Sequence, residues 1–154
     1  MPARKRFVLL LSILLLPDPL FAQDAQGNFL RVERNRQTET DLRITSIGGF
    51  GVAGGKIGHV DLSYIESVDD GNSLVLDVGA DVAFTAGADF FVGGGFLLGY
   101  NVDRNSVVSA YYPELGLAIK VTRQMGVTVT AKRYYNLYDR TEDAVMVGIL
   151  LSER

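Results

Sequence analysis

The chain contains no cysteine, and this absence excludes several kinds of site at once. Disulfide frameworks, thiolate metal centres and a cysteine nucleophile are all ruled out. Attachment of a lipid to an N-terminal cysteine is ruled out with them. Beyond the first few residues the chain also lacks a basic run, and its formal net charge at pH 7 is −3. We therefore expect no binding to nucleic acid.

Long apolar segments are scarce as well. The run from Phe7 to Leu16 is about half of the roughly 20 residues that a membrane-spanning helix needs. It follows the basic residues 4–6 and precedes Ala22, a small residue suited to cleavage, with Ala25 as an alternative cleavage point. This order is typical of a secretory signal peptide, so residues 1–22 are predicted to be removed on export. If the exported protein spans a membrane, it must do so with strands.

After residue 22, apolar and polar residues alternate, and no stretch repeats apolar residues every three or four positions. Such alternation predicts strands. In LVLDVGADVAF, residues 74–84, every even-numbered residue is apolar, whereas the odd-numbered ones include Asp77 and Asp81. We expect strands at seven places, residues 41–52, 56–67, 73–85, 89–100, 106–122, 126–136 and 142–152.

The connections between these strands alternate in kind. Tight turns are expected at 53–55, 86–88 and 123–125, and longer charged loops at 68–72, 101–105 and 137–141. This alternation is typical of outer-membrane barrels, which have an even number of strands. An eighth strand should therefore precede residue 41. The candidate is NFLRVERNR, residues 28–36, and the alternative is a disordered tail. The predicted organisation is a signal peptide at 1–22, an N-terminal segment at 23–40 with the possible first strand, and a barrel at 41–154.

One face of each predicted strand is free of charge. We expect these residues to face lipid: Leu42, Ile44, Phe50, Val52, Val60, Leu62, Tyr64, the even-numbered residues 74–84, Phe90, Val92, Phe96, Leu98, Tyr100, Leu115, Leu117, Ile119, Val121, Val127, Val129, Ala131, Val145, Val147, Ile149 and Leu151. A soluble barrel or sandwich that turned this set inward would also keep it uncharged. The charge-free set therefore does not by itself separate the two readings.

The opposite faces combine glycine with ionisable residues. Glycine weakens strands, so a solvated face has little reason to use it, whereas the narrow interior of an eight-stranded barrel suits small residues between large ones. The interior is predicted to hold a polar network of Arg43, His59, Asp61, Asp77, Asp81, Glu114, Lys120 and Lys132.

Aromatic residues cluster near the predicted strand ends, as in the two interfacial girdles of membrane barrels. The set is Phe50, Tyr64, Phe84, Phe90, Tyr100, Tyr111, Tyr112, Tyr134, Tyr135 and Tyr138. Pro113 interrupts the expected strand at 106–122. Because proline lacks the ladder N–H, we expect a bulge there that inverts the faces of residues 106–112.

Symmetric closure of the loop at 68–72 would pair Asp81 with His59 and Asp77 with Ser63. One interpretation of this constellation is a hydrolytic site, in which a carboxylate orients a base that activates a serine. The other is a buried polar network, in which each charge needs a partner because desolvation is costly. We favour the network, expect no enzymatic activity, and predict Glu114 and Lys132 to be diagonal neighbours within reach of each other.

The signal peptide, the amphipathic strands, FFVGGGFLLGYN, YPELGLAIKVT and the closing AVMVGILLSE together resemble the small outer-membrane β-barrels of Gram-negative bacteria, the OmpA and OmpX type. The resemblance covers residues 41–152 and concerns pattern more than fixed letters. It implies an all-β, antiparallel up-and-down transmembrane barrel of eight strands. It also implies contact with outer-membrane lipid and with the barrel-assembly machinery during insertion. The chain departs from the family at Ser152-Glu153-Arg154, where such barrels carry an aromatic residue read by that machinery.

The predicted function is that of a monomeric outer-membrane barrel with a plugged lumen, no cofactor and a role in envelope integrity or surface contact. The alternatives are a soluble periplasmic barrel that binds an apolar ligand, a narrow porin-like pore, and a lipid-modifying enzyme. His59-Val60-Asp61 lacks the His-x-Ser pair of lipid A deacylases. A metal site among the loop carboxylates is also not favoured, since Asp69-Asp70-Gly71-Asn72 lacks the spacing of a calcium loop.

Overall fold

A computed structural model describes residues 26–35, 41–85 and 89–152. The predicted signal peptide at 1–22 lies outside these residues. Within them, no helix is long and apolar enough to cross a membrane.

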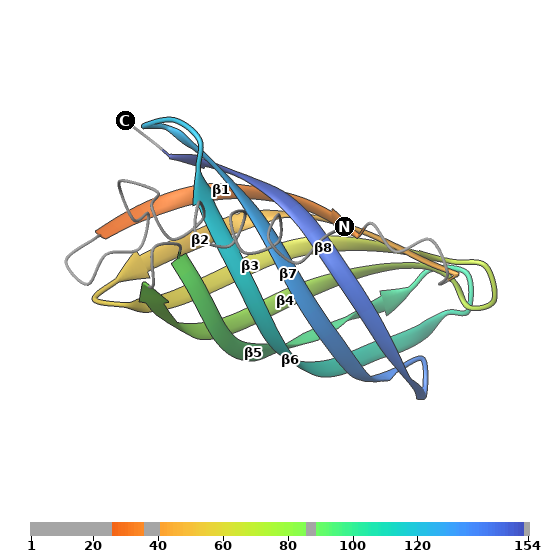
Figure 1. Ribbon diagram of the computed structural model, residues 1–154. Coiled ribbons are helices and arrows are strands. Elements are labelled where there is room, and N and C mark those ends of the chain that lie inside the picture. The colour runs from red at the N-terminus through yellow and green to blue at the C-terminus, as the bar shows by residue number, and fades with distance from the viewer. Residues whose placement is uncertain (1–25, 36–40, 86–88, 153–154) are drawn as a thin grey trace, which may run out of the picture.

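The described chain forms eight strands that close into one antiparallel barrel, each paired with its neighbours in sequence order (Figure 1). The strands are β1 (Gln26–Asn35), β2 (Leu42–Ala53), β3 (Lys56–Ser67), β4 (Gly71–Thr85), β5 (Asp89–Asn101), β6 (Ser106–Lys120), β7 (Met125–Leu137) and β8 (Arg140–Ser152). The predicted all-β, up-and-down barrel of eight strands is confirmed. The possible strand predicted at residues 28–36 is present as β1. It pairs with both β2 and β8 and closes the barrel.

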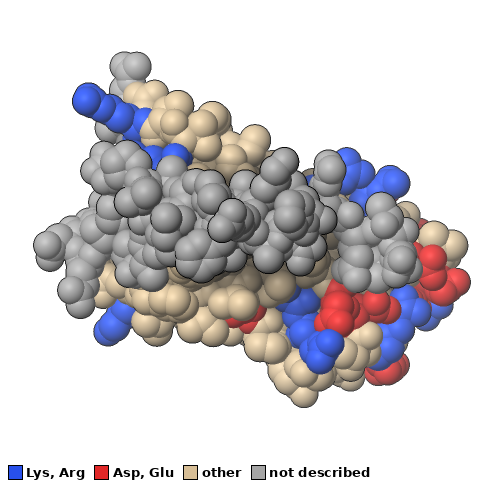
Figure 2. All heavy atoms as spheres, in the orientation of Figure 1, with Lys and Arg blue, Asp and Glu red and all other residues tan. Residues whose placement is uncertain are grey.

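The two ends of the barrel differ. One end, here called the loop end, carries the connections after β3, β5 and β7. The other, the turn end, carries the start of β1, the connections after β2 and β6, and the end of β8. The turn between β2 and β3 is tight because Gly54 and Gly55 adopt positive φ values of 57° and 73°, which glycine allows without steric cost. Figure 2 shows most of the visible charged side chains gathered at the loop end.

Apolar side chains cover the outside of the barrel. Leu62, Leu76 and Leu98 are each about half exposed, at 49–50%. On the described strands, the outward charges lie toward the strand ends: Arg34, Arg43, Lys56, Glu66, Arg133 and Asp143. The middle of the outer surface is therefore an uncharged band.

The predicted faces of β2 are wrong. Leu42, Ile44, Phe50 and Val52 are buried inside the barrel rather than turned outward. The register explains this, because directly paired residues point to the same side of a sheet, and Phe50 pairs with the inward His59. Hydrophobicity alone misassigned the strand, because both ends of the lumen are apolar.

Pro113 produces no inversion of faces. Pairing between β5 and β6 is continuous from Asp89 to Asn101, with Gly94 opposite Pro113, and the inward positions alternate regularly along β6. Pro113 points outward, and pairs between β6 and β7 are interrupted only between Tyr111 and Glu114. The barrel accommodates the missing N–H through this gap in the ladder.

The aromatic set divides between the outside and the lumen. Tyr64, Tyr100 and Tyr111 point outward toward the loop end, and Phe84 stacks on Phe90 near the turn end, with ring centroids 5.7 Å apart. These positions match two girdles. Phe50, Tyr112 and Tyr134 are instead buried in the lumen, so their assignment to the girdles is wrong.

Candidate functional site

The lumen is filled by side chains in three layers. Along β3 the inward residues run from Ile57 through His59, Asp61 and Ser63 to Ile65, so a polar stretch lies between two apolar ones. Around the barrel, the buried apolar side chains gather in one cluster at each end of the lumen. The loop-end apolar cluster is Leu42, Ile44, Ile65, Val75, Leu97, Val108, Ala110, Tyr112, Tyr134, Leu137, Ala144 and Met146. The turn-end apolar cluster is Phe50, Val52, Ile57, Phe91, Ala118 and Leu150.

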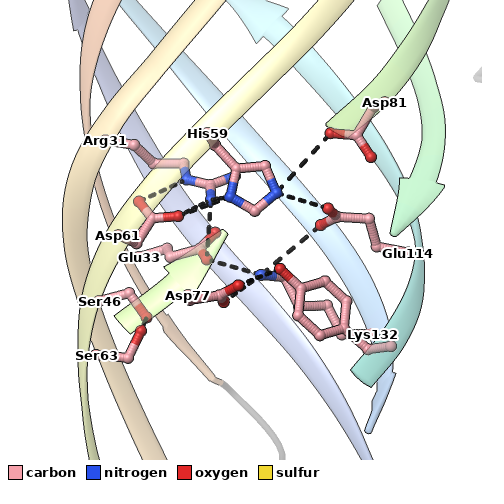
Figure 3. Close-up of polar contacts among 11 residues, drawn as sticks. Arg31, Glu33, Ser46, His59, Asp61, Ser63, Asp77, Asp81, Glu114 and Lys132 are labelled. Carbon is pink, nitrogen blue, oxygen red and sulfur yellow. Dashed lines mark hydrogen bonds and ion pairs between the residues drawn. The ribbon is translucent and has the colours of Figure 1, made fainter. Parts of the chain in front are cut away.

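The middle layer is charged and fully enclosed; we call it the charged layer (Figure 3). Its carboxylates are Glu33, Asp61, Asp77, Asp81 and Glu114, its cations are Arg31 and Lys132, and it includes His59; each of these residues is at most 4% exposed. Carboxylates therefore outnumber the side chains in this layer that can carry positive charge.

Arg31, on β1, occupies one side of the charged layer. Its guanidinium donates to Asp61 through both Nε and Nη2, and its Nη2 lies 3.7 Å from Glu33 Oε1. The guanidinium carbon also lies 5.1 Å from the centroid of the Phe50 ring. Arg31 thus joins the charged layer to the turn-end apolar cluster.

Lys132, on β7, occupies the other side. Its Nζ lies 3.2 Å from Asp77, 3.5 Å from Glu33 and 3.7 Å from Glu114. The same atom lies 4.5 Å from the centroid of the Tyr112 ring, and the Tyr112 hydroxyl donates to Asp77. One ammonium therefore meets carboxylates from three different strands.

His59 connects the two sides. Its Nδ1 lies 2.9 Å from Asp61 Oδ2 and 3.0 Å from Arg31 Nη2, and its Nε2 lies 2.8 Å from Glu114 Oε1. Asp81 Oδ2 lies 4.0 Å from the same Nε2. Neither oxygen of Asp81 or of Glu33 accepts a hydrogen bond from the described residues. Glu33 lies 3.7 Å from Arg31 and 3.5 Å from Lys132, whereas Asp81 has only the 4.0 Å contact with His59 among the ion pairs of the described lumen, so its carboxylate is the least compensated of the charged layer.

The structure brings together six of the eight residues predicted for the polar network, namely His59, Asp61, Asp77, Asp81, Glu114 and Lys132. The other two predictions are wrong. The Arg43 side chain is 61% exposed on the outside and pairs with Glu66, 3.5 Å away. Lys120 is exposed at the turn end. Arg43 was misplaced with the rest of β2, and Lys120 is the last residue of β6, beyond the filled part of the lumen.

The predicted register between β3 and β4 is also wrong, by two residues. Asp77 pairs with Asp61, and His59 pairs with Gly79 rather than with Asp81. The hairpin closes two residues earlier than expected because β4 already begins at Gly71, whose φ is +81°. Glu114 and Lys132 are direct partners, not diagonal ones.

This register removes the geometry of a hydrolytic site. Ser63 Oγ is hydrogen-bonded to Ser46 Oγ at 2.8 Å, while the hydrogen-bonding contacts of His59 are with Arg31, Asp61 and Glu114. No serine–histidine pair forms in the described part of the lumen.

Two members of the charged layer, Arg31 and Glu33, were missed. Both lie on β1, whose sequence carries a usable signal, since Leu30 and Val32 alternate with them and point outward. Treating the segment as a strand would have placed an arginine and a glutamate on its lumen face.

A second group of charges, which includes the buried Asp70, joins the connections at the loop end. Arg104 contacts Asp70 at 2.8 Å, and Arg140 contacts Asp70 at 3.1 Å and Glu142 at 2.5 Å. Tyr138, in the turn after β7, is hydrogen-bonded to Ser73 at 2.7 Å. Burial raises the pKa of this phenol above its ordinary value, and the Ser73 hydrogen bond acts in the opposite direction. These contacts tie the loops to one another.

No known protein family matches the sequence, and no curated protein matches it significantly. Several solved structures share its fold, including the following two. One, from the de novo design of transmembrane β-barrels, has a TM-score of 0.56 and 16% sequence identity, over 82% of this chain and 95% of that chain. The other, the solution NMR structure of the de novo designed TMB2.3, has a TM-score of 0.54 and 17% identity, over 86% of this chain and 98% of that chain. At this identity the likeness concerns the fold alone.

Proposed function

We propose that the protein is an integral outer-membrane β-barrel whose lumen is plugged by its own side chains, with a non-enzymatic role in envelope integrity or surface contact. The observation that carries the proposal is the polarity of the barrel, which is apolar outside and charged in its centre. A protein folded in water has the opposite arrangement.

The outer surface supports placement in a bilayer. Arg or Lys on the lipid face of a barrel costs about 2–4 kcal/mol at the bilayer midplane, and the cost falls toward the interfaces. The described outward charges lie toward the strand ends, and the middle of the wall carries aliphatic and aromatic side chains. Tyrosines toward the loop end and the Phe84–Phe90 pair near the turn end lie where interfacial girdles are expected.

The lumen supports a closed barrel rather than a pore or an enzyme. The charged layer is enclosed between the loop-end and turn-end apolar clusters, so bulk water does not reach it from either end. Its cations contact several carboxylates each, which is the arrangement of an electrostatic plug. A substrate would have to displace one of the apolar clusters to reach it.

The soluble alternative fits the geometry poorly. A periplasmic barrel that binds an apolar ligand would enclose Leu76, Val78, Leu117 and Val129. In the structure Leu76 is 50% exposed, Val78 is 37% exposed and Val129 is 39% exposed, while the interior is charged. An apolar ligand would have no apolar cavity to enter at the centre of this lumen.

The test uses the absence of cysteine, which allows clean single-cysteine labelling. Val78→Cys and Asp77→Cys, adjacent positions on opposite faces of β4, are spin-labelled in the barrel folded in lipid vesicles. We expect the label at 78 to be relaxed by oxygen dissolved in lipid and not by a water-soluble nickel chelate. Val68→Cys, which replaces a loop residue that is 83% exposed, is the aqueous control. A label at 78 that behaves like the one at 68 would overturn the proposal.

Carbonate extraction of cells that express the protein tests its localisation independently of its fold. A barrel in the outer membrane stays in the pellet and shows heat-modifiable gel mobility. Release into the soluble fraction would favour the periplasmic alternative.

A further inference from the structure

We propose that His59, Asp81 and Glu114 form a buried binding site for one divalent transition-metal ion, with Zn²⁺ as the preferred ion. The three side chains come from β3, β4 and β6 and converge within the charged layer (Figure 3). Each offers one ligand atom, and these atoms all lie within 4.8 Å of one another. An imidazole nitrogen and carboxylate oxygens are ligands that Zn²⁺ accepts in proteins.

Asp81 supplies a buried carboxylate that is free to bind a cation. Asp81 is 4% exposed, and its side chain lies toward His59 and Glu114. Neither of its carboxylate oxygens accepts a hydrogen bond from the described residues. Glu114 Oε2 also accepts none, although Lys132 lies 3.7 Å away. A buried carboxylate is costly unless it is paired, hydrogen-bonded or bound to a metal.

The balance of charge in the charged layer agrees with this. Its carboxylates outnumber Arg31, Lys132 and His59 together, so the layer stays negative even with His59 protonated. The cations lie closest to other carboxylates, with Arg31 on Asp61 and Lys132 on Asp77. A divalent ion beside Asp81 would reduce the excess negative charge at the carboxylate that is least compensated.

The distances suit a small ion. A tetrahedral zinc site with bonds of about 2.0–2.1 Å places its ligands about 3.4 Å apart. The His59 Nε2–Glu114 Oε1 distance of 2.8 Å and the His59 Nε2–Asp81 Oδ2 distance of 4.0 Å lie on either side of this value. Changes of about half an ångström would bring these two distances to that value, and the third, between Asp81 and Glu114, is within 4.8 Å. The proton between Nε2 and Glu114 would be released on binding.

His59 already has the outer contact that metal-binding histidines use. A ligating imidazole usually donates its second ring N–H to a carboxylate, which fixes the orientation of the ring. His59 Nδ1 lies 2.9 Å from Asp61 Oδ2, which also accepts from Arg31 Nη2, and Nη2 lies 3.0 Å from Nδ1. With Nδ1–H donating to Asp61, the lone pair of Nε2 faces Asp81 and Glu114.

Two glycines leave the space that these ligands occupy. A Cβ at Gly79 would collide with the imidazole of His59, and a Cβ at Gly93 would collide with Oδ1 of Asp81. Both glycines lie on strands next to the site, β4 and β5.

The experiment measures metal in the folded barrel. Because the turn-end apolar cluster covers the site, the chain is unfolded in urea, treated with chelator and refolded in detergent with Zn²⁺, or with Mn²⁺ for comparison. After desalting, we expect about one zinc per folded chain by elemental analysis and less manganese. Refolding with Co²⁺ should give the intense visible absorption of a tetrahedral site.

Two substitutions make the test specific. Asp81→Asn should lower the bound zinc by at least about tenfold. Glu33→Gln, which changes a buried carboxylate of the charged layer outside the proposed site, should retain it. Zinc should also raise the urea midpoint of the wild type but not that of Asp81→Asn. Gel mobility and circular dichroism establish that each variant has folded before its metal is counted.

Two results would overturn the proposal. A folded wild-type barrel without zinc would mean that a shared proton, not a metal, relieves the Asp81–Glu114 pair. Equal zinc in the wild type and in Asp81→Asn would assign the ion to surface carboxylates.

Discussion

At the scale of single residues, Lys132 is the central compensating charge of the lumen. Its ammonium lies within 4 Å of Asp77, Glu33 and Glu114, and its side chain is completely buried. Removing one partner of a buried ion pair leaves charge without compensation, which costs more than the intact pair contributes.

We expect Lys132→Met to lower the free energy of unfolding by about 3–5 kcal/mol. Urea titration in lipid vesicles, read by heat-modifiable gel mobility, measures the change. Arg133→Met is the matched control on the neighbouring, outward position, where the Arg133–Asp143 pair is half exposed and its loss should change little. Equal effects of the two substitutions would contradict an electrostatic plug.

Gly79 provides a steric test of the same layer. A methyl group there would meet the ring of His59, and forcing extra volume into a packed interior costs about 1–3 kcal/mol. We expect Gly79→Ala to destabilise the barrel by that amount in metal-free buffer. Gly58→Ala, on the outside of β3 with open space around its added carbon, should be neutral or stabilising. The prediction fails if Gly58→Ala destabilises the barrel as much as Gly79→Ala.

At the scale of elements, the β7–β8 hairpin depends on an irregular connection. Its register shifts between Tyr134 and Leu137, and Asn136, Tyr138 and Asp139 have φ values of 66°, 52° and 61°. Non-glycine residues adopt this left-handed conformation at some cost, so other contacts must hold them. The hydrogen bond from Tyr138 to Ser73 at the start of β4 is one such contact.

This contact predicts a dependence on alkaline pH. Because burial raises the pKa of Tyr138 in the folded protein, its contribution to stability is complete below the ordinary tyrosine pKa of 10.0 and is lost as the pH rises through the folded value. The difference in unfolding free energy between wild type and Tyr138→Phe should therefore shift in favour of the variant between about pH 8 and about pH 11. The other tyrosines are the same in both proteins, so their contribution to the pH dependence cancels in this comparison. If the difference in unfolding free energy between the two proteins stays constant with pH, Tyr138 does not cause the alkaline loss of stability.

At the scale of the whole molecule, the layering of the lumen supports the proposed plug. The two apolar clusters and the charged layer between them occupy the interior from end to end. The interior of an eight-stranded barrel is just wide enough for side chains to fill, so the proposal predicts no continuous water path through these layers.

We therefore expect no steady single-channel conductance when the folded protein is reconstituted in planar bilayers. Insertion must be shown independently, by heat-modifiable mobility of the protein recovered from the same vesicles. Stable, ohmic conductance steps from folded protein would contradict the plug and favour a narrow pore.

The sequence predicted the strands of the barrel wall more completely than the side chains of the lumen. Seven strands and the parity that demands an eighth were readable because one apolar face repeats with period two in each strand. Six lumen residues were readable for the same reason, as polar positions opposite an apolar face. Arg43 was misassigned because the more apolar face of β2 lines the apolar ends of the lumen instead of facing outward. Phe50, Tyr112 and Tyr134 were misassigned because lumen aromatics look like girdle aromatics in a sequence.

The sequence by itself determined the architecture, since strand periodicity, turn lengths and the uncharged middle of most outward faces are local properties of the chain. Only the tertiary structure decided the partners within the lumen. A hairpin that closes two residues earlier moves His59 away from Asp81 as a paired neighbour, yet the curvature of the closed barrel brings both to Glu114 on β6. Contacts across a barrel depend on the register of every strand between them, and no local pattern encodes that sum.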